Sequence, residues 1–157
     1  MNITKFGHCC LLIEIDGVRI LTDPGNYSET PMVSDIDGIL ITHEHQDHCH
    51  VESLHIVLAK NPGAQVITHA GVGKILDEAG IKWEPISDGG EKEIKGVKIQ
   101  SFGSEHACIH HDLPPVQNTG FLIAEKLFYP GDSFHNPHRE IEILALPVAG
   151  PWMRLSE

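Results

Sequence analysis

The sequence predicts an α/β (α+β) fold, a four-layer αββα sandwich of two mixed β-sheets that pack on each other with helices outside. Three observations predict it: strand-like apolar segments dominate the chain, several are joined by hairpin signals, and a few helical segments lie between them. The 157 residues are enough for a single domain with a substantial core, residues 1–157.

The N-terminal half alternates strands with helices. The pair Asp16-Gly17 is a two-residue hairpin signal between two strands, and "DGILIT" is typical of a buried strand. A helix is expected from about Val51 to Lys60, where "NPG" ends it, and a second helix over 71–80 ends at Gly80. The strands expected in this half are 3–7, 9–15, 18–22, 37–42 and 64–69.

The C-terminal half is expected to consist of strands, interrupted by a long loop over residues 103–120. The expected strands are 82–86, 90–102, 120–125, 126–130 and 141–148. The last segment, "GPWMRLSE", resembles the first turn of a helix that has no length. We therefore expect the domain to lack a C-terminal helix and to leave one sheet face uncovered.

Charge and hydropathy exclude several classes of function. The formal charge of −11 repels phosphate backbones, so nucleic acid is not expected as a partner. No apolar run approaches the ~20 residues that cross a bilayer, and the first residues lack a signal-peptide pattern. The sequence predicts a cytoplasmic protein with a small-molecule substrate and no membrane partner, and leaves a homo-oligomer open. Four cysteines fit neither a disulfide framework nor a zinc ribbon, and we interpret them as small buried side chains: Cys9, Cys10, Cys49 and Cys108.

The segment "ITHEHQDHCH" concentrates side chains that bind metals directly after a buried strand. His43 and His45 alternate in an extended segment and can therefore face one cation, while Asp47 and His48 can turn toward a second. Imidazole and carboxylate together suit Zn²⁺, with Mn²⁺ and Fe²⁺ as alternatives. The sequence predicts one or two cations here, held where a strand fixes the ligands.

Two later strands deliver a similar side chain at their ends. "VKIQSFGSEH" ends at His106, and "KLFYPGDS" ends at Asp132. Taken alone, His106 suits a polar loop and Asp132 suits a turn after glycine. Their order after the histidine cluster favours a shared metal site.

The set "THEHQDH", "SEH" and "YPGDS" resembles the metallo-β-lactamase superfamily. The start "KFGHCCLLIEIDGVRILTDP" and the phrase "LALPVAGPWM" resemble its branch of small metal-dependent hydrolases related to the L-ascorbate-6-phosphate lactonases. The resemblance implies that His43, His45 and His106 bind a first metal, that Asp47 and His48 bind a second, and that Asp132 bridges both. It also implies one further histidine for the second site, after the last strand and its following helix. This sequence has no histidine after His138.

Three explanations of this departure were open: a truncated domain, a ligand borrowed from another subunit, or a weak second site. Truncation is the explanation we favour from the unfinished last segment. His8 of "FGHCC" and Asp47 are the expected catalytic side chains, His8 as a partner at the edge of the site and Asp47 as the group that orients the nucleophile. Weaker candidates are Asp23, His50, His55, His69, His110, His111, His135 and His138.

The resemblance implies hydrolysis of a small ester, lactone or phosphodiester by a metal-bound hydroxide. A thioesterase, a mononuclear iron dioxygenase on the same fold and a non-catalytic metal-binding protein are the alternatives. Arginine is scarce and absent from the motifs, which gives only weak support to phosphorylated substrates.

Overall fold

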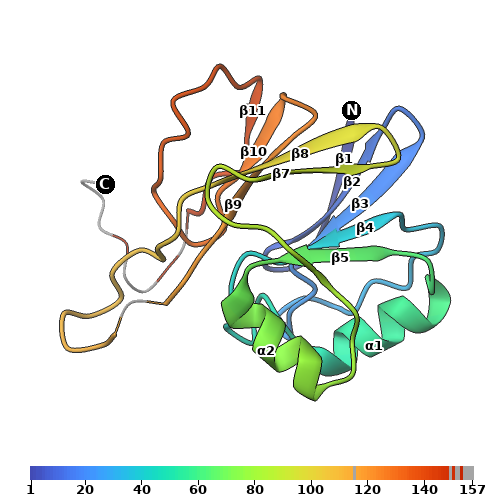
Figure 1. Ribbon diagram of the computed structural model, residues 1–157, viewed down its shortest axis with the longest axis horizontal. Helices are drawn as coiled ribbons and strands as arrows, with labels where there is room; N and C mark the ends of the chain where they lie inside the picture. The colour runs from blue at the N-terminus through green and yellow to red at the C-terminus, as the bar shows by residue number, and fades with distance from the viewer. Residues whose placement is uncertain (115, 149, 151–152, 154–157) are drawn as a thin grey trace.

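The computed structural model describes residues 1–114, 116–148, 150 and 153. A six-stranded mixed sheet, here called sheet A, carries the N-terminal half (Figure 1). Its strands lie side by side in chain order, antiparallel from β1 to β3 and parallel from β3 to β6. They are β1 (Asn2–Phe6), β2 (Cys10–Ile15), β3 (Val18–Thr22), β4 (Gly38–Leu40), β5 (Gln65–Thr68) and β6 (Glu84–Pro85).

A five-stranded sheet, here called sheet B, carries the C-terminal half in the order β11-β10-β9-β8-β7. Only β10 and β11 are parallel, so this sheet is mixed as well. Its strands are β7 (Glu91–Ile94), β8 (Val97–Phe102), β9 (Gly120–Ile123), β10 (Leu127–Tyr129) and β11 (Ile143–Leu144). The α+β class and the two packed sheets confirm the predicted fold class.

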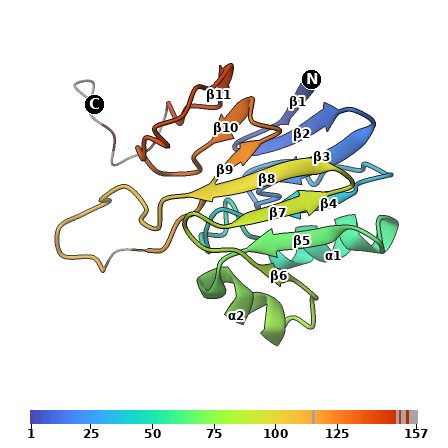
Figure 2. The same ribbon diagram turned by 45° about the horizontal axis from the view of Figure 1, so that its top comes forward.

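Two helices, α1 (Val51–Lys60) and α2 (Ala70–Glu78), cover the outer face of sheet A (Figure 2). No helix lies on the outer face of sheet B among the residues that the structure describes, so this part of the chain forms three of the four expected layers. None of the described helices is long and apolar enough to cross a bilayer. The helical turn expected at 150–157 lies largely outside the described residues.

Alternation along the strands of sheet A divides the core into two clusters. Leu11, Ile13 and Ile15 of β2 belong to the cluster between the sheets, whereas Cys10 and Leu12 belong to the cluster beneath the helices. The central strand β4 is buried on both faces, which is why its sequence is a continuous apolar run.

Turn chemistry explains most of the strand boundaries. Asp16 and Gly17 both have positive φ (51° and 81°), as the predicted two-residue hairpin requires. The segment expected as 90–102 is also a hairpin, because Lys95 and Gly96 have φ values of 46° and 88°. The strands expected over 82–86 and 141–148 shrink to the two-residue β6 and β11.

The two sheets bring their functional strand ends together. In sheet A, β3, β4 and β5 are parallel and therefore end at one edge of the sheet. In sheet B, β8 and β10 flank the antiparallel β9, so these two strands also run in the same direction. The segments after β3, β4, β8 and β10 carry the side chains described next.

Candidate metal centre

Three histidines converge at the first half of the site. His43 Nε2 lies 3.1 Å from His45 Nδ1, and one ring nitrogen from each of His43, His45 and His106 lies within 4.8 Å of the others. His43 and His106 are buried, and His45 is partly exposed. The structure thus brings together the three residues predicted for the first cation.

Asp132 lies between this group and the second one. Its Oδ2 is 3.4 Å from His106 Nε2, and its Oδ1 is 3.3 Å from His48 Nε2. Asp47 Oδ2 lies 3.8 Å from the same nitrogen of His48. One carboxylate therefore faces a histidine of each half-site, which is the arrangement expected of a bridging ligand.

A buried carboxylate, Asp23, orients histidines of both half-sites. Its Oδ2 accepts a 2.8 Å hydrogen bond from His48 Nδ1 and a 2.7 Å bond from the Thr42 hydroxyl, and its Oδ1 accepts from the Thr42 backbone N–H at 2.8 Å. Because the only hydroxyl proton of Thr42 goes to Asp23, His43 Nδ1 is the donor in its 3.0 Å contact with Thr42 Oγ1. His43 and His48 are therefore both held with Nε2 available for a cation.

Tyr129 completes this buried network from sheet B. Its hydroxyl donates to Asp23 Oδ2 at 2.7 Å and lies 3.0 Å from the Cys9 carbonyl. Burial and the Asp23 carboxylate raise the pKa of Tyr129, so it remains a donor. The sequence identified Tyr129 only as a strand residue, although a buried tyrosine needs a hydrogen-bond partner.

The protonation states of the donors fit a metal. Burial and the neighbouring His48 lower the pKa of His43, so its imidazole is neutral. Burial alone would raise the pKa of Asp132, but hydrogen bonds from His106 and His48 outweigh it and lower that pKa. Burial would lower the pKa of His48, but the Asp23 and Asp132 carboxylates outweigh it and raise that pKa. A cation bound at His48 Nε2 would replace a proton there.

Glycines allow the close approach of the loops that carry the ligands. A Cβ at Gly25 would lie 1.8 Å from the Asp47 carbonyl oxygen, so the loop after β3 can rest on the histidine segment only without a side chain there. Gly131 has a φ of +63°, and a Cβ there would lie 2.7 Å from Thr42 Cβ. The "PGD" sequence therefore fixes Asp132 against the end of β4.

The predicted catalytic pair is also in contact. His8 Nε2 lies 3.1 Å from Asp47 Oδ2, and both side chains are partly exposed. The His8 ring meets the rings of Tyr27 and His48 edge to face, each at a centroid distance of 5.7 Å. Asp23, a weaker candidate from the sequence, pairs with His48.

Other candidate histidines have structural or surface positions. His69 is fully buried and accepts the Gly71 N–H at the start of α2, so it does not lie on the rim. His50 pairs with Glu52 and lies 2.9 Å from the Ser53 hydroxyl.

The remaining histidines lie on loops or on the exposed face of a helix. His110 and His111 form an exposed group with Asp112. His135 packs against Gly103, and the backbone N–H of His138 bonds to Asn136. His55 is exposed on α1. None of them contacts the second half-site within the described ranges.

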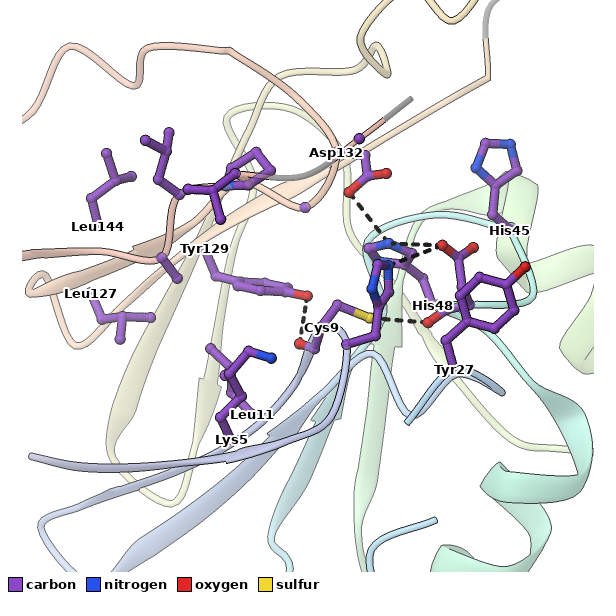
Figure 3. Close-up of a pocket in the computed structure, with 18 of the residues that line it drawn as sticks. Lys5, Cys9, Leu11, Tyr27, His45, His48, Leu127, Tyr129, Asp132 and Leu144 are labelled. Carbon is purple, nitrogen blue, oxygen red and sulfur yellow. Dashed lines mark hydrogen bonds and ion pairs between the residues drawn. The ribbon is translucent and has the colours of Figure 1, made fainter. Parts of the chain in front are cut away.

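A pocket of about 910 Å³ opens beside the metal centre. Figure 3 shows Asp132, His48, Cys9 and Tyr27 gathered at one side of it, and Leu127 and Leu144 at the other. The apolar wall comes from β1, β2, β10 and β11 and from the segment after β11. Among the described lining residues, Lys5 is the only lysine or arginine.

The cysteines differ in exposure, which corrects part of the sequence interpretation. Cys10 and Cys49 are buried and Cys9 is partly buried, but Cys108 is exposed on the loop after β8. Burial raises the pKa of Cys9 to about 11 and that of Cys49 to about 12. Burial also raises the pKa of Cys10.

We expect Ellman's reagent at pH 8 to label one thiol of the folded protein rapidly, that of Cys108. At this pH only about one in a thousand Cys9 side chains is a thiolate, and the reagent cannot reach Cys10 or Cys49. All four thiols should react in denaturant, and Cys108→Ser should remove the rapid phase. A rapid phase of two or more thiols in the folded protein would contradict these burial assignments.

Comparisons with known proteins identify relatives of this chain. A family model described as a beta-lactamase superfamily domain matches residues 2–157. Protein Rv0786c of Mycobacterium tuberculosis is 34% identical over 163 aligned positions, which cover 100% of this chain and 76% of that protein. A UPF0173 metal-dependent hydrolase of Thermoplasma volcanium is 29% identical over 164 positions, covering 96% of this chain and 72% of that protein.

A solved structure shares the fold over most of the chain. The crystal structure of a proposed metal-dependent hydrolase from Parabacteroides distasonis matches with a TM-score of 0.76 and 24% identity, covering 95% of this chain and 70% of the other. The family model spans nearly every residue, including the histidine cluster and Asp132. The chain therefore belongs to the metallo-β-lactamase superfamily.

Proposed function

We propose that this protein is a metal-dependent hydrolase of small carboxylic esters or lactones. The observation that carries the proposal is the position of Asp132 between two groups of histidine and carboxylate donors at the mouth of a pocket. The similarity to a UPF0173 metal-dependent hydrolase supports the same reaction class.

His43, His45 and His106 would hold one cation, Asp47 and His48 a second, and Asp132 both. When bound, divalent cations supply a water of lowered pKa and positive charge for a developing oxyanion. Zinc is the expected metal, because the donors are mainly imidazole nitrogens. Asp23 keeps the ligand nitrogens oriented, and Asp47 at the open side of the site is placed to orient the attacking water.

The pocket lining favours neutral esters over phosphodiesters. Lys5 is the only lysine or arginine among the described lining residues, and its ammonium group already donates to the Gly7 carbonyl. Ile143, Leu144 and Leu146 offer apolar surface next to the site instead. A phosphodiester would meet a strongly acidic protein with little compensating charge.

A substrate panel tests this proposal. The zinc-loaded protein should hydrolyse p-nitrophenyl acetate, p-nitrophenyl butyrate and a γ-lactone faster than bis(p-nitrophenyl) phosphate. A chelator should abolish the activity, and added zinc should restore it. Buffer with the same free zinc is the control. Faster cleavage of the phosphodiester, or ester hydrolysis unaffected by the chelator, would contradict the proposal.

A further inference from the structure

A fourth donor lies next to the second half-site. It belongs neither to the segment of Asp47 and His48 nor to that of Asp132. His8 lies in the turn between β1 and β2, and its Nε2 is 3.1 Å from Asp47 Oδ2. The sequence interpretation placed it at the edge of the site as a partner of other residues. Its position beside three ligand candidates suggests a more direct role.

Consecutive donor atoms around the second half-site have separations close to those of ligands on one ion. Two donors at zinc bond lengths of roughly 2.0–2.1 Å lie about 3.3 Å apart in a tetrahedron. The observed consecutive separations are 3.1 Å from His8 Nε2 to Asp47 Oδ2, 3.8 Å from there to His48 Nε2, and 3.3 Å from there to Asp132 Oδ1. Ring nitrogens of His8 and His48 also lie within 4.8 Å of each other.

The backbone holds His8 in this position. Gly7 has a φ of +76°, and a Cβ there would lie 2.9 Å from Ser28 Cα, so the turn rests directly on the loop after β3. Cys9 is the other nearby donor. Its Sγ is 3.0 Å from the Asp47 carbonyl oxygen and 3.6 Å from that of Asp23, and it donates to these carbonyls. Among the described residues, the His8 side chain has no such competing backbone partner, and it faces the carboxylate of Asp47.

We infer that His8 is a direct ligand of the second cation, which it shares with Asp47, His48 and Asp132. This inference rests on the metal centre of the proposed function. The second half-site would then have four protein donors from three separate segments of this chain.

Zinc stoichiometry and affinity test the inference without a substrate. Wild-type protein and variants are dialysed against buffered zinc and analysed for bound metal, and competition with a chromophoric chelator gives each dissociation constant. We expect two zinc ions in the wild-type protein. His8→Ala should weaken the second ion at least tenfold and leave the first unchanged. His55→Ala, which removes an exposed histidine from α1, should match the wild type.

Two further substitutions separate ligation from an indirect role through Asp47. His8→Asp supplies a ligand that cannot donate to a carboxylate, whereas His8→Gln supplies a donor that binds zinc poorly. Direct ligation predicts tighter second-site binding in His8→Asp than in His8→Gln. The reverse order, or equal zinc binding in His8→Ala and wild type, overturns the inference.

The proposed function can survive that failure, because it is tested separately by ester hydrolysis. If the wild-type protein binds a single zinc ion and its ester hydrolysis still requires metal, only the role of His8 is overturned. A wild-type protein that binds no zinc would overturn both.

Discussion

His43→Ala is expected to abolish the tighter of the bound cations and to lower kcat/KM for esters by more than 100-fold. His43 is one of the three imidazoles that would hold the first cation, and it is fully buried, so no other side chain can move into its place without rearrangement. Loss of a partner that only orients a ligand costs 10–100-fold in affinity or activity, and loss of the ligand itself should exceed that range. Elemental analysis after dialysis and ester kinetics measure the two effects.

The matched control is again His55→Ala, which removes an exposed histidine from the same part of the chain. Circular dichroism must show that His43→Ala remains folded, because His43 lies at the end of the central strand β4. His45→Ala should lose the same ion, since His45 Nδ1 is 3.1 Å from His43 Nε2. Retention of the tight ion and of activity in both variants would refute the assignment of the first site.

The local features of the site were accessible from the sequence. His43, His45, Asp47 and His48 lie within six residues of each other after a recognisable strand, so chain connectivity alone keeps them close. His106 and Asp132 are candidates because each follows a predicted strand after the histidine cluster, and the resemblance to a family implies their ligand roles. The structure explains this, because β8 and β10 run in the same direction and end at the same edge of sheet B.

The network around Asp23 could not be predicted, because it joins residues that are far apart in the chain. Tyr129 is 106 positions from Asp23, and nothing in "LFYPG" indicates which buried acceptor its hydroxyl meets. Hairpin turns were also only partly predictable from the sequence. Asp16-Gly17 is a strong hairpin signal, whereas Lys95-Gly96 adopts the same left-handed conformation without the usual asparagine or aspartate.

Asp23→Asn is expected to destabilise the folded protein by about 3 kcal/mol, the cost of leaving buried donors without their acceptor. Asp23 Oδ2 accepts from Thr42, His48 and Tyr129, all within 2.8 Å. An asparagine that keeps its oxygen toward the Thr42 N–H must turn its NH₂ group toward these three donors. Urea unfolding of the metal-free proteins measures the change as a lower midpoint at unchanged m-value.

The same substitution should weaken zinc binding by 10–100-fold. A donor NH₂ group beside His48 Nδ1 favours the tautomer in which Nδ1 accepts and Nε2 carries the proton. That proton would occupy the nitrogen that faces Asp132. The orientation of His43 suffers as well, because the Thr42 hydroxyl that accepts from its Nδ1 is held by Asp23.

Asp35→Asn provides the matched comparison for both effects. Asp35 also has a positive φ, 59° against 38° for Asp23, but its side chain is exposed and its carboxylate accepts only from Ser34 among the described hydrogen bonds. Asparagine tolerates the left-handed conformation, so backbone strain cannot account for a difference between the two variants. A stability and zinc affinity for Asp23→Asn equal to those of Asp35→Asn would show that Asp23 does not orient the ligands. A loss of both confined to Asp23→Asn would show that one buried carboxylate couples the fold to the metal site.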